Sequence, residues 1–303
     1  MIVFTYVVLV FLILRFTVTL FNFLSNPKLG HYGKKFNDKI SILIYPSSND
    51  FAKLQKSILA QDYKNVELLV ADSQENLIAT ALNARGRYLL FVDANSVIKN
   101  GLLNSLIYRT KVFDLKSIVL IPNRTFRNTR DYLLLPIADF VVLNILPFRL
   151  VRMLNLPSLA AASERYSFYD AESYRHKELT NEADDKKVET LLANGMIVST
   201  RKSSVKEASN ELLKIFDGNP LIVGVYLVLL IAGPMVLILN FELAFISLPI
   251  GLIFLTRVMI SFLTKQNPVV NVILHPLQML ALTGLLVAGT FKKLFTSGIH
   301  SES

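Results

Sequence analysis

The sequence contains no cysteine, which removes several classes of chemistry at once. Without cysteine the chain forms no disulfide, uses no thiolate nucleophile and builds no zinc site with cysteine ligands. The sequence also shows no internal repeat and no low-complexity tract. Residues 1–24 lack the basic start and the small-residue cleavage site of a secretory signal peptide, so we expect this apolar segment to be retained as a helix.

Acidic residues are scarcer than basic ones, at 23 against 32, and the net charge is +9. Much of the basic excess lies beside apolar segments, at Lys28, Lys34, Lys35, Lys39, Arg149, Arg152, Lys292 and Lys293. Basic residues in such places are typical of chains that orient membrane segments and attract anionic lipid. No basic and aromatic motif accompanies this charge, so we expect no nucleic-acid partner.

The composition is 52% hydrophobic and 18% charged, with a mean hydropathy of +0.44. These values are too apolar for an ordinary soluble domain and too charged for a chain made of membrane helices alone, so they predict both parts in one protein. Four apolar segments are candidates for the membrane part, at residues 1–24, 221–239, 243–263 and 269–291. His275-Pro276 lies in the fourth and predicts a kink there.

The predicted organisation is an N-terminal transmembrane helix over 1–24, a domain over 37–215 and a membrane region over 219–292. The lysines after the first helix predict a multi-pass protein of the cell membrane whose domain lies on the cytoplasmic side. Residues 131–154 are apolar with charges set into them, and we interpret them as an amphipathic segment on the membrane surface. A buried helix is the alternative for the same residues.

Short apolar runs in the central domain predict strands at residues 40–44, 66–71, 87–92 and 118–121. Helical spacing or capping residues predict helices at 51–61, 99–112 and 181–194. Strands that alternate with helices in this way favour an α/β domain with a mostly parallel sheet.

Polar residues follow three of the predicted strands. The first strand leads into residues 46–50, the second into Asp72 and Ser73, and the third into Asp93-Ala94-Asn95. The carboxyl ends of parallel strands meet at one edge of a sheet, where ligands of α/β proteins bind. The sequence therefore places its candidate site at that edge.

The ordered set of these stretches resembles the membrane-bound glycosyltransferases of family 2, which have the GT-A fold, and in particular those acting on lipid acceptors. The residues that carry the resemblance are 40–50, 58–72, 84–95, 202–220 and 273–278, and they cover most of the chain. The resemblance implies a GT-A-like (Rossmann-like) fold and an inverting hexosyltransferase. Its donor would be a nucleotide-sugar, expected to be a UDP-sugar, and its acceptor a lipid or lipid-linked molecule.

The resemblance also implies roles for particular residues. The loop after the first strand would contact the nucleotide, through Pro46, Ser48, Asn49 and Asp50. Asp72 would bind the base. Asp93 would contact the donor diphosphate and, with Asn95, hold Mg²⁺ or Mn²⁺ against it.

Asp184 and Asp185 are the catalytic-base candidates that the resemblance implies, with Glu182 nearby. A carboxylate there would take the proton of the acceptor hydroxyl. The same acids could instead be first-turn residues that complement a helix dipole. Arg201 and Lys202 likewise have two interpretations, as interfacial charges or as contacts to the diphosphate.

The sequence departs from the family pattern at three places, and one of them is the loop after Tyr174, which lacks the family's Gly-Gly-His sequence. Asn95 stands where the family has an aspartate, and an amide oxygen binds a hard cation more weakly than a carboxylate does. The connection from Asp72 to Gly86 is short and lacks the family's additional strand and Gly-Lys-rich loop. An active enzyme with a modified site and a catalytically degenerate membrane subunit of a glycolipid or polysaccharide system are both compatible with these departures.

Overall fold

The computed structural model describes residues 2–45, 51–154, 165–180, 187–202, 204–240 and 243–299. Contacts divide the chain into two units. The helical unit contains Met1–Asn26, Phe126–Pro147 and Lys202–Ser303, and the sheet unit contains Pro27–Thr125 and Phe148–Arg201. The expected single block over 37–215 is thus divided, because two of its segments pack with the terminal helices.

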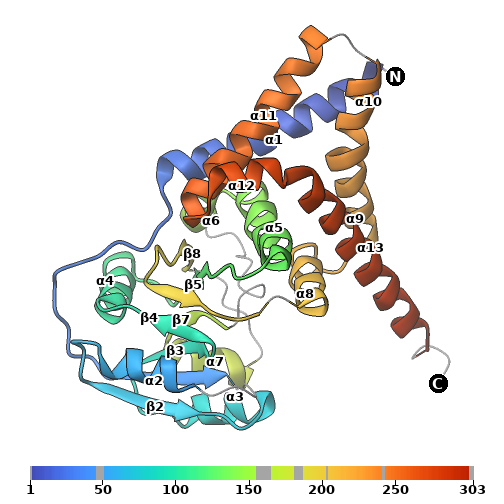
Figure 1. The fold of residues 1–303 in the computed structure, drawn as a ribbon. Helices are drawn as coiled ribbons and strands as arrows, with labels where there is room; N and C mark the ends of the chain where they lie inside the picture. The colour runs from blue at the N-terminus through green and yellow to red at the C-terminus, as the bar shows by residue number, and fades with distance from the viewer. Residues whose placement is uncertain are drawn as a thin grey trace. The chain divides into compact units, whose positions relative to one another are not determined.

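The sheet unit is built on six strands in the order β2-β1-β3-β7-β5-β8, and Figure 1 labels each of them except β1. Their bounds are β1 Ile40–Tyr45, β2 Val66–Val70, β3 Tyr88–Asp93, β5 Ser117–Ile121, β7 Ser167–Asp170 and β8 Val188–Leu192. Neighbouring strands are parallel except at β7, which is antiparallel to both β3 and β5. The predicted α/β class with a mostly parallel sheet is confirmed.

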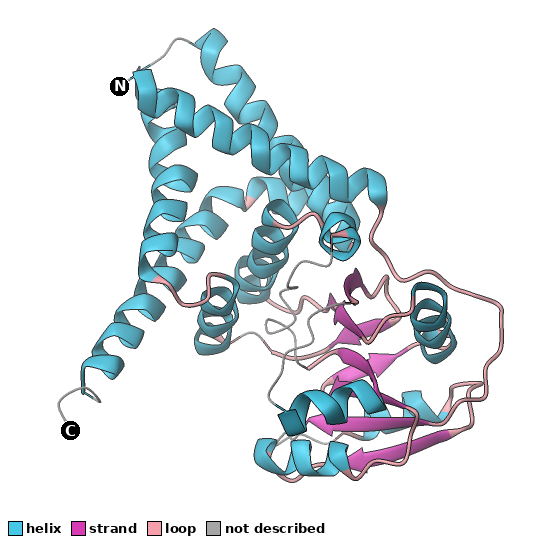
Figure 2. Cartoon of the chain, turned by 180° about the vertical axis from the view of Figure 1, so that it is seen from behind, coloured by secondary structure: helices cyan, strands magenta, loops and turns pink. Residues whose placement is uncertain are grey.

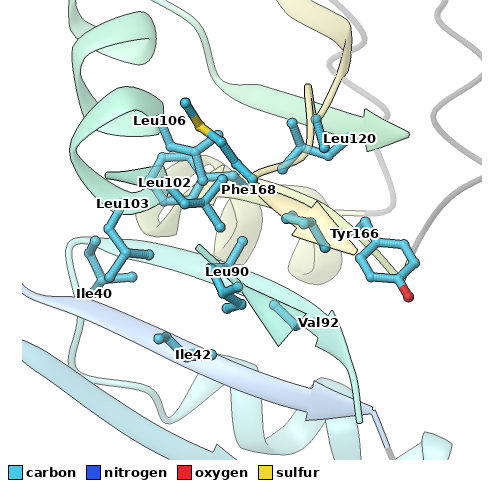
Figure 3. Close-up of a cluster of buried hydrophobic side chains, with 14 of the residues drawn as sticks. Ile40, Ile42, Leu90, Val92, Leu102, Leu103, Leu106, Leu120, Tyr166 and Phe168 are labelled. Carbon is cyan, nitrogen blue, oxygen red and sulfur yellow. The ribbon is translucent and has the colours of Figure 1, made fainter. Parts of the chain in front are cut away.

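Helices cover both faces of this sheet because side chains alternate along each strand. On one face Ile42 and Leu90 pack with leucines of α4, Leu102–Phe113, as Figure 3 shows, and with α2, Ala52–Leu59. On the other face Leu43 and Phe91 pack with α3, Gln74–Leu82, and α7, Ala171–Thr180. The central strands β1 and β3 are therefore buried on both sides, as their uninterrupted apolar runs predict.

A second, smaller sheet of the same unit has the order β4-β9-β6. Its strands are β4 Ser96–Ile98, β6 Asn123–Arg124 and β9 Ile197–Ser199. Strand β4 begins three residues after Asp93 and pairs antiparallel with β9. This pairing brings the chain just after β9 to the carboxyl end of β3.

The helical unit contains α1 Ile2–Ser25, α5 Thr129–Ile145, α8 Val205–Ile215, α9 Pro220–Leu227, the π-helix η2 Val228–Ala232, α10 Gly233–Asn240, α11 Leu243–Thr264, α12 Pro268–Ile273 and α13 His275–Ile299. In Figure 2 the helices of this unit are joined by loops. Four of its stretches are long and apolar enough to cross a membrane, at Ile2–Ser25, Pro220–Leu239, Ile246–Thr264 and His275–Leu294. The expected break at His275-Pro276 is present, since α12 ends at Ile273 and α13 begins at His275.

Polar side chains of this unit lie inside it. The Arg15 Nε donates a hydrogen bond of 3.0 Å to the Asn144 Oδ1, and the Arg257 guanidinium contacts Gln278. Large apolar residues such as Leu14 and Leu221 are exposed instead. This inside-out distribution is what a membrane-spanning bundle requires, because lipid does not hydrogen-bond polar groups.

Two sequence expectations need correction. Residues 139–144 of α5 are all buried, so the amphipathic interpretation does not hold over this helix, and the buried-helix alternative does. The remainder of that segment includes α6, Phe148–Met153, in the sheet unit. The helix predicted over 181–194 is wrong at its end, because Val188–Leu192 is the strand β8, paired with β5. Residues 181–186 lie outside the described chain.

Candidate functional site

The candidate site is the carboxyl edge of the three parallel strands β2, β1 and β3. The register pairs Tyr45 at the end of β1 with Asp93 at the end of β3, and Ile44 with Val70 at the end of β2. Asp72 follows β2 and is exposed. Strands are spaced by roughly 4.8 Å, so Asp72 lies about 10 Å along the edge from Asp93.

Several of the predicted site residues cannot be placed. Pro46, Ser48, Asn49 and Asp50, expected at the nucleotide, lie outside the described residues. The same holds for the catalytic-base candidates, at residues 184 and 185. Their roles stay predictions.

Asp93 and Asn95 do come together, in the tight turn between β3 and β4. The Asp93 Oδ1 accepts hydrogen bonds from the backbone N–H of Asn95 at 2.8 Å and from its side-chain Nδ2 at 3.3 Å. The Asn95 carbonyl in turn accepts hydrogen bonds from the N–H and the hydroxyl of Thr200. The turn is thus fixed from both sides, and the Asp93 side chain is buried.

The other oxygen of Asp93 is bound by two arginines. Its Oδ2 lies 2.9 Å from the Arg201 Nη1 and 3.3 Å from the Arg165 Nη1. Both arginine side chains remain partly exposed. We name Asp93, Arg165 and Arg201 the Asp93 cluster; it combines one negative with two positive charges.

Two antiparallel pairings bring these arginines to Asp93. Phe91 pairs with Ser167 in β7, so the register continued by two residues sets Arg165 opposite Asp93. Ser96 pairs with Ser199 in β9, and the same extension sets Arg201 opposite Ala94. Sequence analysis singled out Arg201 with two interpretations and missed Arg165. Both arginines share one feature of position. Arg165 precedes β7 by two residues and Arg201 follows β9 by two residues, and these strands pair with β3 and β4.

Tyr166 lies beside this cluster. Its hydroxyl is 3.0 Å from the Ser96 Oγ and points away from the labelled leucines in Figure 3. Burial raises the pKa of Tyr166 to about 12, with a further increase from the negative charge of Asp93. The phenol therefore stays protonated at physiological pH, and its hydroxyl shares a hydrogen bond with the Ser96 hydroxyl.

The described residues do not fit a divalent cation. Both oxygens of Asp93 already accept hydrogen bonds, and no group of three or more histidine, aspartate or glutamate side chains in the described chain could hold a metal ion. A cation near Asp93 would also meet two guanidinium groups. Repulsion between unit charges at 4 Å is about 1 kcal/mol in water and about 4 kcal/mol at an effective dielectric constant of 20. The predicted Mg²⁺ or Mn²⁺ site of Asp93 and Asn95 is therefore not formed by this arrangement.

No family model and no curated protein matches the chain. Among solved structures it is similar to S. aureus TarS residues 1–349 in complex with UDP-GlcNAc, with 11% identity, coverage of 86% of this chain and 92% of that one, and a TM-score of 0.38. It is also similar to the mannosyltransferase PcManGT from Pyrobaculum calidifontis in complex with GDP-Man and Mn²⁺, with 11% identity, coverage of 97% and 99%, and a TM-score of 0.45. Likenesses of this size assign neither a family nor an activity to the chain.

Proposed function

We propose that this protein is a membrane-anchored glycosyltransferase with a GT-A-like sheet unit. It moves a sugar from a nucleotide-sugar, a UDP-sugar in the first instance, to a lipid or lipid-linked acceptor at the cytoplasmic face. The observation that carries the proposal is the Asp93 cluster, which places charged side chains at the carboxyl edge of the parallel strands. Ligands of α/β sheets bind at such edges. The four apolar helices support a membrane location and hence a lipid acceptor.

The proposed reaction is a direct displacement. The acceptor hydroxyl oxygen forms a bond to the anomeric carbon of the sugar, and the bond from that carbon to the diphosphate oxygen breaks with its electron pair. Asp184 or Asp185 takes the proton of the acceptor hydroxyl. The configuration of the sugar inverts, and no protein nucleophile is needed.

The test is transfer of a labelled sugar to extractable lipid. The full chain is reconstituted in vesicles of native lipid and incubated with labelled UDP-sugars and GDP-mannose, and nucleoside diphosphate release and lipid label are both measured. We expect Asp184→Asn or Asp185→Asn to lower transfer at least 100-fold, as loss of a general base does, while nucleotide binding persists. Glu172→Gln, an exposed acid of α7, is the matched control and keeps the wild-type rate.

Absence of both release and lipid label with every donor would contradict the enzyme. It would favour the second candidate, a catalytically degenerate membrane subunit of a glycolipid or polysaccharide system. The observations that favour this candidate are the amide of Asn95 in place of a carboxylate and the short connection from Asp72 to Gly86. A degenerate subunit that retains the nucleotide site binds nucleotide but gives neither nucleoside diphosphate release nor lipid label. Nucleotide binding measured beside sugar transfer therefore separates the two candidates.

A further inference from the structure

The Asp93 cluster holds more positive than negative charge, and its arginines reach the surface. Asp93 is one carboxylate, whereas Arg165 and Arg201 are two guanidinium groups that remain charged at any physiological pH. Each guanidinium carries five N–H donors in a planar fork that matches the oxygens of a phosphate.

Asp93 acts on these arginines as an anchor. Its carboxylate is buried, and the Asn95 hydrogen bonds to Oδ1 fix its orientation. Long arginine side chains lose conformational freedom when they bind a ligand, and an anchor that holds them beforehand reduces this loss. The geometry therefore suits an anion that arrives from the exposed side.

We propose that Arg165 and Arg201 bind the diphosphate of the donor directly, so that donor binding at this site needs no divalent cation. This inference rests on the proposed function and names the groups that hold its donor. Asp93 then serves as a positioning residue for the arginines and not as a metal ligand. The guanidinium groups also offset the negative charge that the diphosphate gains when its bond to the sugar breaks, since they are fixed before the reaction.

The experiment is a titration of the full chain in detergent with UDP, GDP and inorganic pyrophosphate, each in EDTA and in Mn²⁺, followed by calorimetry. We expect each diphosphate to bind in EDTA within about threefold of its affinity in Mn²⁺. Arg201→Gln should weaken binding in EDTA by roughly 10-fold or more, as loss of a charge-assisted hydrogen bond does. Arg165→Gln should weaken it less, because its contact to Asp93 is longer.

Arg87→Gln is the matched control. Arg87 directly precedes β3, at the opposite end of the strand from Asp93, and its side chain is exposed and paired with Asp38. The variant removes the same charge and should leave diphosphate affinity unchanged. Arg201→Lys keeps a positive charge without the fork, so it should bind more tightly than Arg201→Gln. Thermal unfolding of each variant checks that the fold is kept.

Diphosphate binding by Asp93→Asn shows whether Asp93 acts as a metal ligand or as a positioning residue for the arginines. In our proposal the variant keeps diphosphate binding in EDTA within several-fold of the wild type, because the arginines remain. Binding that requires Mn²⁺ and disappears in Asp93→Asn would overturn this inference and leave the proposed function standing. No binding of any of the three probes in either condition would overturn both. Binding of pyrophosphate without UDP or GDP would support the diphosphate site and count against the nucleotide donor.

Discussion

Two carboxylates of the sheet unit each contact several arginines, and the two groups face different surroundings. Glu189 in β8 lies within 4 Å of Arg109, Arg149 and Arg152, and we name these four residues the Glu189 cluster. Its arginine side chains are 5%, 22% and 18% exposed. In the Asp93 cluster, Arg201 is 29% and Arg165 is 42% exposed. Similar charges thus form a covered group in one place and an open one in the other.

The centre of the Glu189 cluster is a buried ion pair between Glu189 and Arg109. The Arg109 Nε and Nη2 donate hydrogen bonds of 2.7 and 2.6 Å to the two oxygens of Glu189. The guanidinium groups of Arg109 and Arg152 lie over the Phe113 ring, at 4.3 and 4.2 Å from its centre. Burial lowers the pKa of Arg109, but the hydrogen bonds and charge of Glu189 outweigh it and raise the pKa overall.

The position along the strand explains the difference. Glu189 is the second residue of β8, and its side chain is covered by α4 and α6, which carry the arginines. Asp93 is the last residue of β3, so its partners come from chain ends beyond the paired strands and leave one side open. A carboxylate and arginines that are covered between a strand and helices stabilise the fold. The same groups at the end of a strand are open on one side and available to a ligand.

The largest expected effect separates the clusters by stability. Glu189→Gln should destabilise the sheet unit by about 3–5 kcal/mol, because Arg109 is left as an uncompensated buried charge. Asp93→Asn should cost less, about 1 kcal/mol, because the two arginine side chains that lose their partner are partly exposed and stay in contact with water. Urea unfolding of the full chain in detergent measures both. Equal losses in the two variants would make the Asp93 cluster structural as well.

A second carboxylate beside Asp93 should weaken the affinity of the Asp93 cluster for a diphosphate. Asn95→Asp places another negative charge beside Asp93, where it competes with a diphosphate for the arginines. We expect affinity for UDP in EDTA to fall about 10-fold, which corresponds to about 1.4 kcal/mol, and Mn²⁺ to restore part of it. The control is Asn83→Asp, an exposed substitution at the end of α3, which should leave UDP affinity unchanged. Unchanged or tighter binding of Asn95→Asp in EDTA would contradict the proposed role of the arginines.

Salt should affect the two clusters unequally. Raising the ionic strength from about 0.1 M to about 1 M shortens the screening length from roughly 10 Å to roughly 3 Å. Diphosphate affinity at the partly exposed Asp93 cluster should then fall several-fold in calorimetry. The stability difference between wild type and Glu189→Gln should change little over the same range. A salt-independent diphosphate affinity would argue against a site made of exposed guanidinium groups.

The last expectation concerns stability at high pH and the phenol of Tyr166. Its pKa in the folded state is about 12, against about 10 for a free tyrosine. Between these values the unfolded chain loses the phenol proton while the folded chain keeps it, so stability falls as the pH rises through this window. Tyr166→Phe should remove that part of the pH dependence, measured by unfolding at several pH values. Asp93→Asn should lower the Tyr166 pKa, read from tyrosinate absorbance, because the negative charge of Asp93 contributes to the increase.

Much of the fold follows from local sequence. The apolar runs at 40–44 and 87–92 predict β1 and β3 because a strand buried on both faces has no room for polar side chains. The long apolar segments predict the four membrane-length helices for a similar reason, since lipid-facing and buried positions are both apolar. The place of Asp93 at the end of β3 was equally predictable, because the apolar run stops there.

Other features depend on partners distant in the chain. Residues 188–192 were expected to be helical, and they form a strand because β5 offers them a parallel partner, which no local pattern encodes. Residues 139–144 of α5 are buried, and one of their partners is distant in the chain: the Arg15 Nε of α1 donates a hydrogen bond to the Asn144 Oδ1 across 129 residues.

The surroundings of Asp93 likewise depend partly on local sequence and partly on partners distant in the chain. The sequence by itself determined that a carboxylate ends a buried strand and that Asn95 follows it. The pairings of β7 with β3 and of β9 with β4 determined that Arg165 and Arg201 meet that carboxylate. Strand register is set by packing between segments that lie 72 and 108 residues apart. Only the tertiary structure therefore decided that the charge beside Asp93 is a pair of guanidinium groups.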